Sequence, residues 1–197
     1  MVQPADLDPK RGSGMPSELA RLLDELRADL AADEPAGPAY ARIAAPADAG
    51  DVPAELPAGL RDLLLAADGL RAGAFELVSV DRLADVQYFL DHAPGFSPIP
   101  RDKNDWLVVA TCRDEPIFLE RATGSVWYFP PTGTEWFMAD AFEELAPGLD
   151  SFVHYYVLGP GYAELVTDDD GWYAFLHRQG LLDDADEEGE DEDEAQP

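Results

Sequence analysis

Leucines near the start of the chain recur at spacings of three and four residues, which predicts an amphipathic helix. The apolar positions are Leu19, Leu22, Leu23, Leu26 and Leu30. The run Pro16-Ser17-Glu18 is typical of a helix N-terminus, and the helix should end before Pro35. Residues 33–53 are rich in Pro, Ala and Gly and therefore predict an irregular connection.

Two further helices with a strand between them are predicted next along the chain. Pro57 suits the first turn of a helix, and Gly69 suits the left-handed residue that ends it. The apolar face of this helix consists of Leu56, Leu60, Leu63, Leu64 and Ala67. Residues 75–80 have the β-branched and aromatic content of a strand, and Asp81 is expected to cap the helix that follows. The apolar face of that helix consists of Leu83, Val86, Phe89 and Leu90.

The middle of the chain consists of apolar segments separated by short turns. The predicted strands are residues 106–111, 116–121, 125–130 and 134–138. Because only a few turn residues lie between them, neighbouring strands should pair as hairpins. The sheet should therefore be mainly antiparallel.

Helical periodicity returns after the predicted strands. It runs from Asp140 to residue 158, where Gly159-Pro160-Gly161 should stop it, and a last helix is expected over residues 171–182. The whole pattern predicts an α+β fold, in which helices flank a mainly antiparallel sheet of about five to six strands.

Length and cysteine content limit the organisation of the chain. A chain of 197 residues suits one domain, which we expect over residues 15–182 after a flexible leader at residues 1–14. Cys112 is the only cysteine, which excludes an internal disulfide and fits a reducing, cytoplasmic environment. The sequence shows neither a signal peptide nor an apolar run long enough to span a membrane.

Negative charge is the most unusual property of the composition. The net charge is −28, and residues 183–197 contain 10 carboxylates and no basic residue, which predicts a disordered acidic tail. Residues 1–182 still carry 31 acidic and 13 basic side chains, a net charge of −18. Such a surface repels nucleic acid and anionic membranes and favours a basic protein as partner.

Candidate catalytic residues are few. His92, His154 and His177 do not pair at metal-ligand spacing, and an ordinary helix position is favoured for His154 over a zinc or general-base role. Cys112 has no histidine near it in sequence, which favours a structural thiol over a nucleophile. We therefore expect no catalytic residue, no cofactor-binding residue and no metal site.

Acidic residues leave one enzymatic alternative open. The three aspartates at residues 168–170 lack the spacing of a calcium loop, and capping of the helix at Trp172 explains them better. Asp114 and Glu115 lie in a predicted hairpin turn, where solvated acids are common. A metal-dependent hydrolase that uses acids near Asp114 or Asp168 is the alternative from the enzyme class.

Aromatic residues are interleaved with the predicted strands. They are Trp106, Phe118, Trp127, Tyr128, Phe129, Trp136 and Phe137. Packing in the core explains at least half of them, but strand side chains alternate between two faces, so consecutive aromatics cannot all face one core. Outward Trp and Tyr residues are typical anchors of protein interfaces. The candidate partner-binding residues are Asp114, Glu115, Trp127, Tyr128 and Trp136.

A resemblance to a known family adds to this interpretation. The segment LPAGLRDLL at residues 56–64, followed by Asp68-Gly69, resembles the opening motif of the SUKH superfamily, in which many members have Asn where this chain has Asp68. The matching segments that follow are a strand and helix at 75–90, a strand at 106–110, a turn at 123–126, and a final helix with Leu149, Phe152 and Tyr156. The resemblance covers roughly residues 54–158 and carries over no catalytic residue.

The resemblance implies a SUKH-like fold and a binding function. Bacterial members of this superfamily are known largely as immunity proteins that neutralise toxins, many of them nucleases, and fungal relatives act as interaction hubs. We therefore expect a non-enzymatic immunity protein that binds a basic toxin domain. An intracellular scaffold or regulatory interaction module is the alternative, and the oligomeric state and the identity of the toxin stay open.

Overall fold

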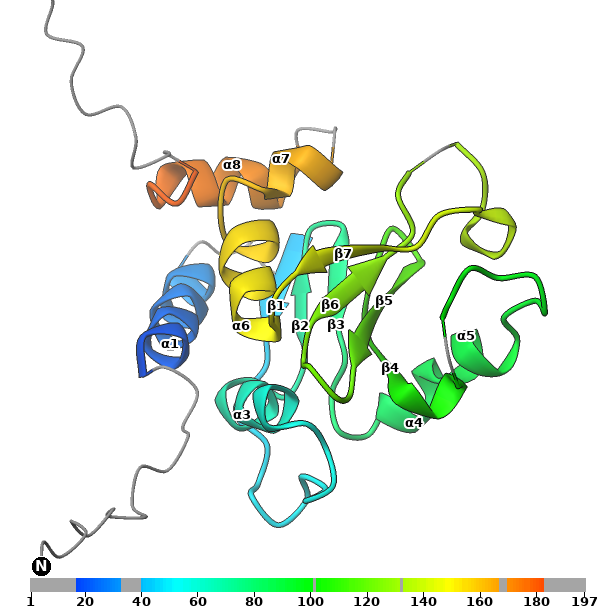
Figure 1. Cartoon of the computed structure of the whole chain (residues 1–197). Helices are drawn as coiled ribbons and strands as arrows, with labels where there is room; N and C mark the ends of the chain where they lie inside the picture. Colours follow the sequence, from blue (N-terminus) through cyan, green and yellow to red (C-terminus); the bar gives the residue numbers. More distant parts are fainter. Residues whose placement is uncertain (1–16, 33–39, 101, 132, 167–169, 183–197) are drawn as a thin grey trace, which may run out of the picture.

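The computed structural model describes residues 17–32, 40–100, 102–131, 133–166 and 170–182 (Figure 1). The expected leader at residues 1–14 and the expected acidic tail at residues 183–197 lie outside the described residues, as do Asp168 and Asp169.

Seven strands form one antiparallel sheet, and their order in space follows their order in the chain (Figure 1). The strands are β1 (Ala41–Ile43), β2 (Leu70–Ala72), β3 (Phe75–Leu77), β4 (Trp106–Cys112), β5 (Glu115–Glu120), β6 (Val126–Tyr128) and β7 (Glu143–Ala146). Each strand pairs with its neighbours in sequence. The short turns correctly predicted the pairing of β4 with β5 and of β5 with β6. The predicted α+β fold with a mainly antiparallel sheet is confirmed, with slightly more strands than expected.

Helices lie at both ends of the described chain and between the strands. The α-helices are α1 (Ser17–Ala32), α3 (Ala58–Ala66), α4 (Leu83–Val86), α5 (Tyr88–Asp91), α6 (Leu149–Phe152), α7 (Tyr162–Leu165) and α8 (Gly171–Arg178). Two 3-10 helices, η1 (Lys103–Asp105) and η2 (Trp136–Met138), and a π-helix, η3 (Val153–Val157), complete the set. The leucine patterns near the N-terminus and after Pro57 correctly predicted α1 and α3.

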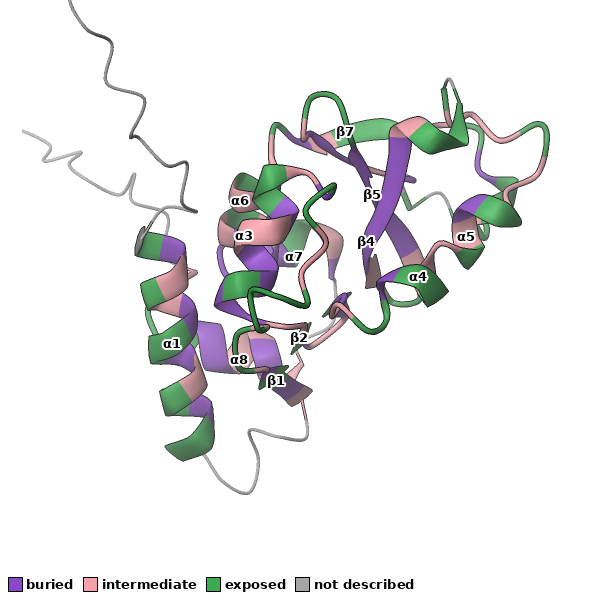
Figure 2. Ribbon diagram, turned by 90° about the horizontal axis from the view of Figure 1, so that it is seen from below, coloured by how far each residue is buried: buried purple, intermediate pink, exposed green. Residues whose placement is uncertain are grey.

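The sheet separates two hydrophobic clusters. The larger cluster joins the leucines of α1 and α3 to residues of α6, α8 and alternate strand positions such as Leu107 and Leu119. The smaller cluster lies on the other face, where Leu90 of α5 packs near Trp106 and Phe118. Figure 2 shows the buried residues of α1 turned toward the rest of the chain and its exposed residues turned away. Both faces of the central strands are thus buried, which explains their nearly continuous apolar sequences.

Arg27 joins three elements at one end of the larger cluster. Its guanidinium donates hydrogen bonds to the carbonyls of Ile43 at 3.3 Å, Ala44 at 2.8 Å and Ala66 at 3.0 Å. These carbonyls lie at the ends of β1 and α3, so one charged side chain of α1 satisfies acceptors of both elements.

Hydrogen bonds of Tyr162 and Asp170 hold α8 against the β2–β3 hairpin. The hydroxyl of Tyr162 donates to Asp170 Oδ2 at 2.5 Å and accepts the backbone N–H of Ala74 at 3.0 Å. Asp170 also caps α8 by accepting the N–H of Tyr173 at 2.8 Å, as expected for the aspartate before this helix. Gly73 forms the hairpin turn at φ +55°, directly beneath the Tyr162 hydroxyl. Burial and the bond to Asp170 raise the pKa of Tyr162.

Several predicted elements differ from the structure. Residues 134–138 were predicted as a strand, but Trp136–Met138 form the 3-10 helix η2, and the strand that pairs with β6 is β7. The helix predicted from Asp140 is wrong over residues 143–146, which form β7, although the apolar positions there also fit a helical period. The strands β1 and β2 are too short, at three residues each, to show a period in sequence.

The helix predicted after Asp81 is also shorter than expected. It is divided into α4 and α5 around Gln87, whose side-chain amide hydrogen-bonds the backbone of Val108 in both directions. Asp81 does not cap α4 but accepts a hydrogen bond from the hydroxyl of Ser79. The chain therefore turns here through contacts with β4, which local sequence does not reveal.

Candidate functional site

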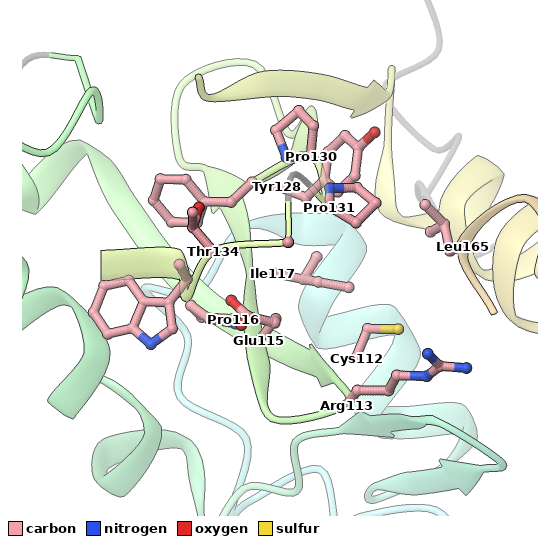
Figure 3. A pocket seen from close by; sticks show the side chains of 13 residues that line it. Cys112, Arg113, Glu115, Pro116, Ile117, Tyr128, Pro130, Pro131, Thr134 and Leu165 are labelled. Atoms are coloured by element: carbon pink, nitrogen blue, oxygen red, sulfur yellow. The ribbon is translucent and has the colours of Figure 1, made fainter. Parts of the chain in front are cut away.

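A pocket of about 220 Å³ lies at the free end of the β4–β5 hairpin. Its walls are mainly apolar and come from the hairpin, the end of β6, the loop that follows it, and α7. The side chains labelled in Figure 3 include Cys112, Ile117, Tyr128, Pro130, Pro131 and Leu165. Ile117 lies at the centre of this view, between the two prolines and Cys112. We call this cavity the Glu115 pocket, after the carboxylate among its described lining residues.

The turn beside the pocket has an uncommon backbone. Cys112 pairs with Glu115, so that only Arg113 and Asp114 connect the two strands, with φ values of +50° and +67°. Two successive left-handed residues make the turn that matches the twist of a hairpin, but Asn-Gly is the usual sequence for it. Side chains with a Cβ cost stability in this conformation, so the turn beside the pocket is strained at Arg113 and Asp114.

Glu115 has an unfavourable environment for its charge. Burial raises the pKa of its carboxyl group, and the nearby charges of Glu135 and Asp114 raise it further, while the backbone N–H of Trp136 donates a hydrogen bond that lowers it. The net direction is upward, so the negative charge here is less stable than on an ordinary glutamate.

The opposite rim of the pocket is also acidic. Burial raises the pKa of the Tyr128 hydroxyl, and the charges of Glu143 and Glu164 raise it further. The pKa of Tyr156 is raised by burial and by Glu164, which also accepts a hydrogen bond from Tyr155 at 2.6 Å. Carboxylates of β7 and α7 therefore act on Tyr128 of the pocket, as Glu135 and Asp114 act on Glu115.

Aromatic side chains, some exposed and some half-buried, continue from the pocket across α5 and η2. Trp136 is a pocket residue, and its ring centroid lies 5.5 Å from that of Phe89 and 5.8 Å from that of Phe137. The ring centroids of Phe89 and Tyr88 are 6.2 Å apart. Tyr88, Phe137 and Met138 are 57%, 41% and 58% exposed. We call Tyr88, Phe89, Trp136, Phe137 and Met138 the aromatic ridge. Its exposed apolar area is unusual beside so many charges.

The structure brings four of the five predicted partner-binding residues to this end of the molecule. Glu115, Tyr128 and Trp136 line the pocket, and Asp114 lies in the adjoining turn. Trp127 lies elsewhere, because its ring stacks on Phe142 at 5.4 Å in the smaller cluster.

The other ridge residues were missed in the sequence. Phe89 was assigned to the apolar face of a helix, and it is indeed half-buried against the smaller cluster. Phe137 was assigned to a strand, which did not signal its exposure. A broad hollow beyond the ridge, lined by Phe89, Asp114, Arg42, Arg71 and Glu76 among others, lies over the outer side of β1 to β4. The ridge therefore runs between this hollow and the Glu115 pocket.

The histidines and the cysteine are in ordinary environments. His92 stacks on Tyr88 at 3.9 Å, and His154 Nε2 is 3.8 Å from Asp150 Oδ1. Burial raises the pKa of the Cys112 thiol to about 11, which keeps it protonated near neutral pH. Within the described part of the chain, no group of three or more His, Cys, Asp or Glu residues could hold a metal ion.

No helix in the described part of the chain is long and apolar enough to cross a bilayer.

Comparison with known proteins gives one family. The family model of the SUKH-4 immunity proteins matches residues 2–170. This match extends beyond the 54–158 segment of the sequence motifs and takes in α1 and α7. No curated protein matches the chain.

Proposed function

Because this chain belongs to the SUKH-4 immunity protein family, we propose that it neutralises a basic toxin domain by binding it, without catalysing a reaction. The binding surface consists of the Glu115 pocket and the aromatic ridge. The observation that carries the proposal is that the aromatic ridge meets carboxylates at Trp136. Its backbone N–H donates to Glu115, and its ring contacts Phe89 and the exposed Phe137.

The aromatic ridge has the composition of an interface centre. Tyr and Trp contribute most to binding where they become desolvated, because they bury a large area at a small cost in side-chain entropy. Tyr88 and Phe137 are about half exposed and therefore have area left to bury in a complex. Met138 beside them can adapt its shape to a partner.

The charge of the chain indicates that its partner is positively charged. The net charge of −28 attracts a basic protein over a distance and repels nucleic acid. Many toxins that act on nucleic acid have a basic surface for that reason, and an acidic protein in the cytoplasm can compete for it. We expect association to be fast at low ionic strength and slower as salt rises.

A neutralisation assay tests the proposal. The chain is co-expressed with a basic toxin domain found in a neighbouring reading frame, and growth of the host is compared with and without the chain. We expect rescue by the wild-type chain, and we expect Tyr88→Ser with Phe137→Ser to raise the Kd for that domain by roughly 10- to 100-fold.

Leu65→Ser is the matched control, since Leu65 is 39% exposed on α3, away from the ridge. It should change the Kd less than about threefold. Full neutralisation by the Tyr88 and Phe137 double variant would show that the ridge is not the binding surface. Failure of the wild-type chain to bind any basic toxin domain, with tight binding to several unrelated proteins, would favour a scaffold instead.

A further inference from the structure

We infer that the Glu115 pocket receives the side chain of one arginine of the bound protein, with the Glu115 carboxylate as its acceptor. This inference rests on the proposed function, since the arginine belongs to the toxin domain. It names the chemistry that the pocket recognises and the residue that provides it.

The size and walls of the pocket suit one long side chain. A cavity of about 220 Å³ is too small for a folded segment, and its walls include Ile117 and two prolines that can contact an aliphatic stem (Figure 3). Tyr128 and Trp136 also line it. A guanidinium stacks on aromatic rings and is more weakly hydrated than an ammonium group, so it loses less on entering such a site than lysine does.

The charges around the pocket favour a cation. Glu115 lines it, the charges of Glu135 and Asp114 act on Glu115 from one side, and those of Glu143 and Glu164 act on Tyr128 from the other. A carboxylate has about four acceptor positions, and the N–H of Trp136 uses one of them. A bidentate guanidinium can use two of the others.

Arg113 is the basic residue among the described pocket residues, and its position does not block this use. In Figure 3 its guanidinium extends away from the Glu115 carboxylate, past Cys112. The Glu115 carboxylate therefore faces the pocket without the Arg113 guanidinium over it in this view.

The environment of Glu115 gives the binding a driving force. Its raised pKa means that the charged form is destabilised in the free protein, by burial and by two neighbouring carboxylates. A guanidinium in the pocket would remove this destabilisation, whereas a neutral side chain of the same shape would not. We therefore expect the pocket to bind a guanidinium more tightly than a neutral side chain of the same shape.

A titration with small probes tests the pocket without the toxin. Nα-acetyl-arginine amide and its neutral isostere Nα-acetyl-citrulline amide are added to the full-length chain, and Trp136 and Tyr128 resonances are followed by NMR. We expect the arginine probe to bind with a Kd on the order of millimolar, and citrulline at least fivefold more weakly. Equal binding of the two probes, or no shift at Trp136 and Tyr128, would overturn the inference.

Two variants distinguish the contribution of the Glu115 carboxylate to probe binding from that of the net negative charge. Glu115→Gln keeps an acceptor for the N–H of Trp136 and should weaken arginine-probe binding at least fivefold. Glu144→Gln removes a similar charge from an exposed position on β7 and should change it less than twofold. Equal effects of the two substitutions would assign probe binding to net charge and reject the pocket.

The toxin domain provides the final comparison. Glu115→Gln should raise its Kd by roughly 10- to 100-fold, because a buried charged pair loses one partner. Unchanged Kd in this variant, with wild-type neutralisation intact, would reject the arginine pocket and leave the proposed function standing. If the wild-type chain neutralises no toxin, the proposed function fails, while the probe titration still decides the chemistry of the pocket.

Discussion

Substitution of Gly73 by alanine tests the tie between the β2–β3 hairpin and α8. A Cβ at this position would lie 2.9 Å from Trp172 Cβ and closer still to the Tyr162 hydroxyl and the Asp170 carboxylate. Tyr162 and Trp172 are both fully buried and cannot move aside into solvent. The substitution must therefore displace the Tyr162 hydroxyl from its hydrogen bonds.

The expected loss of stability has two parts. A left-handed alanine at φ +55° costs about 1 to 2 kcal/mol. The Tyr162 hydroxyl would lose its bonds to Asp170 and to the N–H of Ala74, and each loss inside the protein costs about 1 to 2 kcal/mol. The free energy of unfolding should thus fall by about 3 to 6 kcal/mol.

Gly124→Ala is the matched control, because Gly124 also has a positive φ, +80°, but no atom lies within 4 Å of its Cβ position. It should cost only the conformational part, about 1 to 2 kcal/mol. Urea unfolding followed by tryptophan fluorescence gives both values if the m-value is unchanged. In a Tyr162→Phe background, Gly73→Ala should cost less, since the hydroxyl is absent. Equal losses for Gly73→Ala and Gly124→Ala would refute the steric argument.

Three further predictions concern single side chains. Glu115→Gln should stabilise the free protein at pH 7, by up to about 0.5 kcal/mol because solvent screens the charge. The extra stability of the variant should shrink as the pH falls through the raised pKa of Glu115, because the folded wild type then takes up a proton more readily than the unfolded chain. A difference in urea midpoints that does not change with pH would contradict this. Cys112, with a pKa of about 11, should react with iodoacetamide at pH 8 on the order of 100-fold more slowly than a free cysteine, and equal rates would show an ionised thiol. Arg27→Met should lower the free energy of unfolding by about 2 to 4 kcal/mol, whereas Arg21→Met, in an exposed ion pair, should change it by less than about 0.5 kcal/mol in the same urea titration.

The parts of the fold that the sequence predicted are those with a long, single-faced pattern. The leucines of α1 and the continuous apolar runs of β4 and β5 identify these elements without tertiary information. The three-residue strands β1 and β2 carry only one outward residue each, Arg42 and Arg71, and no period can be read from so few positions. Their pairing is fixed by Gly69 and Gly73, whose positive φ values turn the chain on either side of β2.

The candidate site was predictable in its residue types but not in its arrangement. Asp114 and Glu115 follow from the turn, whereas their meeting with Trp136 depends on η2, which replaces the strand predicted at residues 134–138. Trp127 and Tyr128 are adjacent in sequence and point to opposite faces of β6, so one joins the smaller cluster and the other the pocket. Which of the two faces remains open to a partner depends on where α5 and α7 pack, and that is decided by contacts distant in sequence.

Several features that cost stability meet at this one end of the molecule. Arg113 and Asp114 adopt a left-handed turn that glycine or asparagine would form with less strain, Glu115 is charged in an unfavourable environment, and Phe137 exposes its ring to water. Stability alone would favour a glycine in the turn, a glutamine at 115 and a polar residue at 137. Features of this kind persist where binding offsets their cost, and a basic, arginine-bearing partner would offset the charge at Glu115 and cover the aromatic ridge in the same event. The overall acidity brings such a partner to the molecule, but it is this local arrangement that can tell one basic protein from another.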